Sequence, residues 1–294
     1  MSTTETVDPR FEGIDLWPTA IAVEAMLEGQ LAAIAAIQTQ VTRIAQAGDA
    51  AAERLMRDGR LIYVGAGTSA RIAVQDGVEL GPTFNWPHER LAYVIAGGLG
   101  ALSNSIEGAE DNSAAAREEI EKLQVGNNDV VIGVAASGRT PFTIAAVKAA
   151  RDAGALTIGV SNNPHSLLDS TAEIGIVAAT GSELVAGSTR MKAGTAQKAI
   201  LNLISTTVML RLGKVYRGLM VSMVISNDKL LGRAHAMVAT IAGCKEAVAV
   251  SAVGTAKGDI RKAVLIALGL SERDAGTLLA KHSENLRSAI EDMP

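Results

Sequence analysis

Residues 61–69 read Leu-Ile-Tyr-Val-Gly-Ala-Gly-Thr-Ser, a short apolar run that leads into a loop of small and hydroxyl-bearing residues. An apolar run of this length that ends in glycine is typical of a strand buried on both faces of a sheet. We expect a helix after Ser69, because such loops commonly turn the chain from a strand into a helix. The stretch therefore predicts a strand, a tight turn and a helix in succession.

The same alternation recurs further along the chain. More strands are predicted at residues 91–95, 130–134, 156–160 and 174–177, and helices at 110–123 and 141–153. Strands that alternate with helices form parallel sheets, because each crossover connection is a helix that packs on the sheet. The chain is therefore predicted to be an α/β protein whose parallel sheet is flanked by helices on both faces.

Helical segments are expected on either side of this sheet. Apolar residues at helical spacing predict helices over residues 18–47, then through 57, and later over 190–212 and 219–240. Glycines divide the last 50 residues into short helices, which indicates a small bundle. We expect an N-terminal helical segment at 1–50, the sheet domain at 51–214 and a C-terminal helical region at 215–294.

Composition excludes several classes of protein. The chain has 294 residues, 48% of them hydrophobic, and its formal net charge of -4 provides no broad basic surface for nucleic acid. The single Cys244 excludes an internal disulfide, and the four histidines lack metal-ligand spacing. The N-terminus is polar and acidic, and no run of 18 apolar residues occurs. We expect a cytoplasmic protein with no nucleic-acid partner and no membrane association.

Three loops are rich in hydrogen-bond donors, at residues 65–69, 136–140 and 187–198. The first two follow predicted strands, and parallel sheets bind ligands beyond the carboxyl ends of their strands. The third contains Ser188 and Thr189 at an expected helix start, where exposed N–H groups favour a phosphate or a carboxylate. Together the loops predict a phosphorylated, hydroxyl-rich ligand.

Each loop also has a purely structural interpretation. Gly65 and Gly67 can serve only to turn the chain, and residues 137–140 can be an ordinary cap before Pro141. The cations of the third loop, Arg190, Lys192 and Lys198, can form a solvated face. A nicotinamide cofactor is disfavoured, because residues 65–70 lack the third glycine of the dinucleotide fingerprint and no P-loop lysine follows.

Two carboxylates stand out by position as candidates for acid–base chemistry. Glu79 lies just before Gly81-Pro82-Thr83-Phe84, where the helix after the first loop is expected to end. Glu110 follows the loop after the second predicted strand, although a carboxylate there can also simply stabilise a helix start. Asp76 and Glu107 are the alternatives.

Several segments together resemble the N-acetylmuramic acid 6-phosphate etherase family of the sugar isomerase domain superfamily. They are GAGTS at 65–69, PTF at 82–84, IEGAED at 106–111, AASGRTP at 135–141, GSTRMKAGTAQK at 187–198 and GKVYRGLMV at 213–221. The longest is specific to this family and to its relative, the glucokinase regulatory protein. The resemblance implies a flavodoxin-like three-layer sugar isomerase domain, a ubiquitin-associated-like C-terminal bundle and a homodimer without metal or organic cofactor.

The resemblance also implies an activity and a site. The family cleaves the lactyl ether of N-acetylmuramate 6-phosphate with water, during cell-wall recycling. Its two active-site glutamates match Glu79, expected to protonate the departing lactate oxygen, and Glu110, expected to abstract a proton or activate water. Candidates to bind the sugar phosphate are Thr68, Ser69, Ser137, Arg139, Thr140, Ser188 and Thr189, with Arg190 or Lys192 near the lactyl carboxylate.

The chain departs from the family pattern in places. Ala70 stands where glycine is usual, Val7-Asp8 replaces an Arg-Asn pair, and residues 77–81 and 222–230 differ around the retained Glu79 and Lys229. A relative that acts on another 3-substituted sugar phosphate therefore stays open. So do a non-catalytic sugar-phosphate sensor and an aldose–ketose isomerase.

Overall fold

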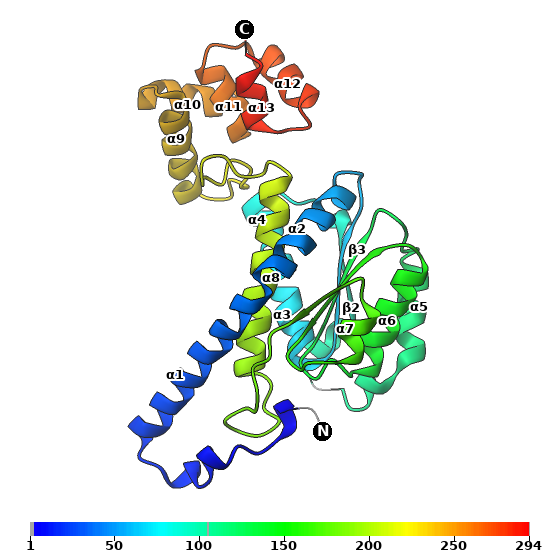
Figure 1. Cartoon of the computed structure of the whole chain (residues 1–294). Helices are drawn as coiled ribbons and strands as arrows, with labels where there is room; N and C mark the ends of the chain where they lie inside the picture. The colour runs from blue at the N-terminus through cyan, green and yellow to red at the C-terminus, as the bar shows by residue number, and fades with distance from the viewer. Residues whose placement is uncertain (1–2, 105, 294) are drawn as a thin grey trace. The chain divides into compact units, whose positions relative to one another are not determined.

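The computed structural model describes residues 3–104 and 106–293, and it divides into two compact units. The first unit spans Met1–Gly77 and Glu89–Thr207, and the second spans Val78–His88 and Val208–Pro294. Figure 1 shows the elements of both units, which are described here one at a time.

The first unit is built on a sheet of five parallel strands. These are β1 (Leu61–Gly65), β2 (Leu91–Ile95), β3 (Val130–Ala135), β4 (Leu156–Ser161) and β5 (Ile174–Val177), in the spatial order β2-β1-β3-β4-β5. Every residue of β1, β3 and β4 is buried, which explains their uninterrupted apolar sequences. The predicted parallel sheet is confirmed, and its strand order is that of flavodoxin-like folds.

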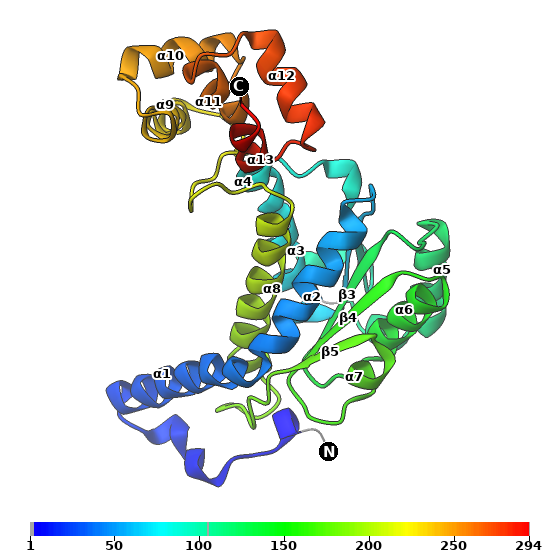
Figure 2. The same ribbon diagram turned by 45° about the horizontal axis from the view of Figure 1, so that its top comes forward.

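Helices cover both faces of this sheet. On one face lie α5 (Ser113–Lys122), α6 (Pro141–Asp152) and α7 (Leu167–Thr171), and on the other lies α2 (Val41–Leu55). Figures 1 and 2 show α3 (Gly67–Val78) and α8 (Lys192–Arg211) on the same side as α2. Close packing of α6 requires glycine at position 133 of β3, because a Cβ there would lie 2.4 Å from the side chain of Val147. The predicted three-layer arrangement is therefore confirmed.

Short turns and one long exposed helix precede the sheet. The 3₁₀ turns η1 (Thr3–Glu5), η2 (Pro9–Phe11) and η3 (Ile14–Leu16) lead into α1 (Thr19–Ala35). The 3₁₀ segment η4 (Ala36–Gln40) then separates α1 from α2, so the single helix predicted over residues 18–47 is interrupted. Among the seventeen residues of α1, all of them described, Ala33 alone is buried.

The remaining 3₁₀ turns of the first unit connect helices and strands near the edges of the sheet. They are η5 (His88–Arg90), which runs into β2, η6 (Leu99–Leu102) and η7 (Ala109–Asp111). The last of these begins after Gly108, which has a φ of 69°. It therefore places an acidic turn directly before α5.

The second unit is helical, with its own apolar core. It contains α4 (Leu80–Phe84), α9 (Asp228–Ala242), α10 (Glu246–Thr255), α11 (Ile260–Ala267), α12 (Glu272–Lys281) and α13 (Leu286–Glu291). The core is formed by apolar side chains of these C-terminal helices and of the segment before them, including Val221, Met237 and Val264. This agrees with the predicted helical C-terminal region.

The helix predicted from Leu219 is wrong over its first nine residues. Tyr216 and Leu219 exchange backbone hydrogen bonds across a turn, and the Val224 N–H donates to the Pro82 carbonyl. The side chain of Asn227 then accepts a hydrogen bond from the Leu230 N–H and so caps α9. Tertiary contacts thus hold an apolar stretch extended, although its composition also suits a helix.

Candidate active site

A cavity of about 470 Å³ lies in the first unit, beyond the carboxyl ends of β1 and β3. This volume is within the range of about 300–1,000 Å³ for small-molecule sites. Its walls come from five separate segments of the chain. The lining residues are Glu5, Ala66, Gly67, Thr68, Ser69, Glu110, Asp111, Ala136, Ser137, Arg139, Thr140, Pro141 and Thr189.

The start of α3 forms one wall of the cavity. The loop after β1 turns sharply at Gly67, whose φ of 52° lies in the left-handed region. Helix α3 begins at that residue, and Ser69 in its first turn is buried while Thr68 is half-buried. The first N–H groups of a helix carry partial positive charge, so this wall offers backbone and hydroxyl donors to an anion.

The start of α6 forms a second, similar wall. Gly138 has a φ of 62°, and a Cβ there would lie 2.3 Å from the side chain of Ser166. Pro141 begins the helix, and Thr140 at its N-cap makes no capping hydrogen bond through its side chain. The first turn of α6 therefore keeps its donors available, beside the exposed Arg139.

The start of α8 differs from the other two helix starts. The carboxylate of the fully buried Glu183 accepts hydrogen bonds from the backbone N–H groups of Lys192 and Ala193, both at 2.9 Å. The Lys192 ammonium donates to the Ser182 carbonyl at 2.9 Å. The helix end that we expected to receive a phosphate or a carboxylate thus holds a carboxylate of the chain itself.

The structure brings some of the candidate binding residues together and leaves others apart. Thr68, Ser69, Ser137, Arg139, Thr140 and Thr189 all line the cavity. Ser188, Arg190 and Lys192 are not among the described residues that line it, and Lys192 lines a smaller cavity between α1 and residues 183–191. The donors of the third loop therefore reach the cavity through Thr189.

The two candidate glutamates lie in different units. Glu110 is exposed in η7 and lines the cavity, and its carboxylate has no hydrogen-bond partner among residues 3–104 and 106–293. Glu79 belongs to the second unit, where it is exposed at the N-cap of α4 and makes no capping hydrogen bond. The catalytic roles of both residues stay predictions.

The alternative carboxylates differ from these two. The buried Asp76 accepts hydrogen bonds from the Tyr63 hydroxyl at 2.6 Å, from the Ser205 hydroxyl at 3.1 Å and from the Asn202 amide. Burial is the main reason that the pKa of Tyr63 is raised, and the charge of Asp76 adds to it. Asp76 therefore joins β1, α3 and α8, while Glu107 is exposed and is not among the described residues that line the cavity.

Sequence reasoning missed two acidic residues of the cavity, Glu5 and Asp111. Asp111 follows Glu110 directly, so its place in the same acidic turn was a signal that could have found it. Glu5 lies in a polar N-terminal stretch with no local pattern that marks a site. Its arrival at the cavity depends on contacts made across the fold.

Comparison with known proteins identifies the family. Residues 40–151 match the model of the glucokinase regulatory protein N-terminal SIS domain, and residues 109–206 match that of the SIS domain. The chain is 42% identical over 288 residues to an N-acetylmuramic acid 6-phosphate etherase of Deinococcus radiodurans, covering 98% of this chain and 94% of the relative. The chain belongs to the N-acetylmuramic acid 6-phosphate etherase family. The etherase of Erwinia tasmaniensis is 43% identical, with the same coverage of both chains.

Solved structures agree with the fold of this etherase family member. A phosphoheptose isomerase from Francisella tularensis superposes with a TM-score of 0.50 at 17% identity, covering 66% of this chain and 98% of that one. At this identity the likeness shows the fold alone. The sugar isomerase fold and the family predicted from the sequence are both confirmed.

Proposed function

We propose that this protein cleaves the lactyl ether of N-acetylmuramate 6-phosphate with water, to give N-acetylglucosamine 6-phosphate and D-lactate. The observation that carries the proposal is identity above 40% to etherases along nearly the whole chain. A cavity of suitable size, with two helix starts, hydroxyls and carboxylates in its walls, supports it. The reaction makes the protein a carbon–oxygen lyase.

The phosphate of the substrate suits the donor-rich side of the cavity. The starts of α3 and α6 present backbone N–H groups together with the hydroxyls of Ser69, Ser137 and Thr140. Arg139 adds a positive charge beside them. The start of α8 contributes less, because Glu183 already satisfies its first two N–H groups.

The chemistry needs two groups that transfer protons. In the open-chain sugar the C1 aldehyde acidifies the C2 proton, and its removal expels lactate from C3 as the ether oxygen is protonated. Water then adds at C3 of the unsaturated aldehyde, and a proton returns to C2. We assign protonation of the leaving oxygen to Glu79, and proton abstraction or water activation to Glu110, each worth roughly 100-fold to 10,000-fold.

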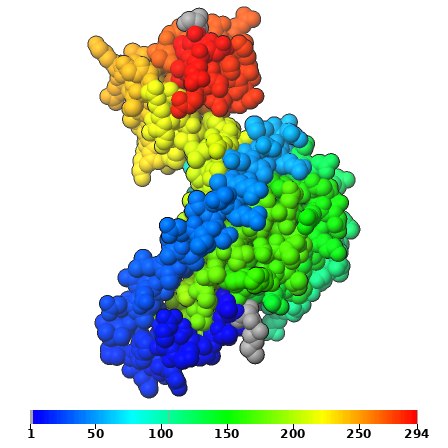
Figure 3. All heavy atoms as spheres, in the orientation of Figure 1, coloured from blue at the N-terminus to red at the C-terminus, as the bar shows by residue number. Residues whose placement is uncertain are grey.

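We propose further that the protein works in the cytoplasm, in the recycling of cell-wall sugars, as a homodimer without metal or organic cofactor. By length and composition, one described helical stretch, Thr19–Leu55, is apolar enough to cross a membrane, and 11% of its most apolar window is buried. Glu24 and Glu28 within α1 argue against a hydrocarbon environment. A second subunit is the better cover for this exposed face (Figure 3).

The decisive experiment incubates the purified protein with N-acetylmuramate 6-phosphate and measures D-lactate. We expect release by the wild type and by Glu107→Gln, and a loss of at least about 100-fold in Glu110→Gln. Glu107 is a matched control, since it lies three residues away and is exposed outside the cavity. Tight binding without lactate release would instead favour a sugar-phosphate sensor, which the match to the regulatory-protein domain makes the second candidate.

A further inference from the structure

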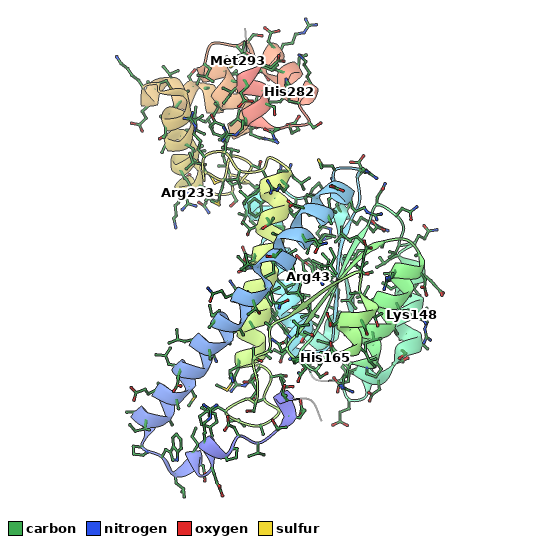
Figure 4. All side chains as sticks on the ribbon, in the orientation of Figure 1. Arg43, Lys148, His165, Arg233, His282 and Met293 are labelled. Atoms are coloured by element: carbon green, nitrogen blue, oxygen red, sulfur yellow. The ribbon has the colours of Figure 1, made fainter. Side chains whose placement is uncertain are left out.

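The N-terminal segment is attached to the carboxyl edge of the sheet through Asn163, in the loop after β4. The Thr3 N–H and hydroxyl both donate to the Asn163 carbonyl oxygen, at 2.7 and 2.6 Å. The amide of Asn163 donates to the Thr4 hydroxyl at 3.1 Å and to the Ala136 carbonyl at 2.8 Å. One side chain thus joins the N-terminal segment to the loop after β3, and Figure 4 shows the nearby His165 at this edge.

Other contacts hold the segment on either side of Glu5. Thr4 is fully buried, and its carbonyl accepts a hydrogen bond from the Gly187 N–H at 3.2 Å. Further along, the Asp8 carboxylate accepts a hydrogen bond from the Ser182 hydroxyl at 3.2 Å. The backbone that carries Glu5 is therefore fixed by three separate loops of the first unit.

The side chain of Glu5 enters the cavity. One of its oxygens would lie 3.0 Å from a Cβ added at Gly187, so the carboxylate lies directly over that glycine. Among residues 3–104 and 106–293, this carboxylate has no hydrogen-bond or ion-pair partner. An acceptor held in place without a donor is available to a ligand.

We propose that Glu5 is a specificity-determining residue whose carboxylate accepts a hydrogen bond from a hydroxyl or amide group of the sugar. The choice of the sugar rather than the phosphate follows from charge, since an ionised carboxylate repels a phosphate and has no proton to donate. The helix starts and Arg139 supply donors to the phosphate, while Glu5 supplies an acceptor to the rest of the molecule. This inference rests on the proposed function for the identity of the ligand.

Kinetics of Glu5→Ala provide the first test. We expect kcat/KM for N-acetylmuramate 6-phosphate to fall by roughly 10-fold to 100-fold, mainly through KM, as for a lost hydrogen bond to a charged group. Glu12→Gln, which removes a charge from the same exposed segment away from the cavity, should behave as the wild type. Unchanged kinetics in Glu5→Ala, or a fall in kcat alone, would overturn the assignment.

Ligand binding provides a second test that needs no turnover. Dissociation constants are measured by calorimetry for N-acetylglucosamine 6-phosphate and for analogues that each lack the 3-hydroxyl, the 4-hydroxyl or the acetamido group. In the wild type one deletion should cost about 10-fold or more, and in Glu5→Ala the same deletion should cost almost nothing. Equal penalties in both proteins for every analogue would refute the contact. A wild type that binds these ligands but releases no lactate would instead refute the proposed function.

Discussion

Glu79 carries the strongest prediction at the scale of single residues. Its side chain is exposed and makes no capping hydrogen bond at α4, so Glu79→Gln should leave folding unchanged. Loss of the general acid should lower turnover at least about 100-fold. D-lactate release and the melting temperature check both expectations, with the exposed Glu246→Gln as a control from the same unit. Near-normal turnover in Glu79→Gln would contradict the assigned role.

A buried ion pair gives a second residue-scale prediction, on pH. Burial opposes the charge of Asp129, but hydrogen bonds from the Arg60 side chain and from the N–H groups of Arg60 and Gly126 lower its pKa below 3.8. A carboxyl group whose pKa is lowered on folding stabilises the protein above its unfolded pKa, and this stabilisation is lost as the pH falls through the folded pKa.

Asp129→Asn should therefore lower the free energy of unfolding by about 1–3 kcal/mol at pH 7. The difference from the wild type should shrink below about pH 4, where the carboxyl group of the unfolded chain is protonated. Urea unfolding at several pH values measures both quantities. A difference that stays constant down to pH 3 would contradict the proposed stabilisation by the charged form.

At the scale of elements, the start of α8 depends on one distant side chain. Glu183 lies nine residues before the helix and accepts hydrogen bonds from its first two N–H groups. Glu183→Gln places an amide NH₂ against one of those donors, so we expect a loss of about 1–3 kcal/mol in unfolding free energy. The exposed Glu173→Gln is the matched control. Equal stability of the two variants would show that the cap contributes nothing.

At the scale of the whole molecule, the exposed apolar face of α1 predicts self-association. Leu27 and Leu31 are 58% and 64% exposed, and burial of such side chains between subunits is favourable by roughly 25 cal/mol per Å². Sedimentation velocity should show a dimer for the wild type and a shift toward monomer for Leu27→Glu. The exposed Val250→Glu, in the C-terminal helices, should stay dimeric. A monomeric wild type at micromolar concentration would contradict the proposed homodimer.

The sequence by itself determined the architecture of the sheet, because strands buried on both faces must be continuously apolar, and these runs alternate with helical patterns. It also indicated the donor-rich loops, since glycines and hydroxyls that follow a strand form a local pattern. Only the tertiary structure decided which groups meet: Glu5 reaches the cavity through Asn163, Glu183 occupies the start of α8, and residues 219–227 stay extended. Each of these outcomes depends on partners far away in the chain, and local propensity and periodicity contain no information about such partners.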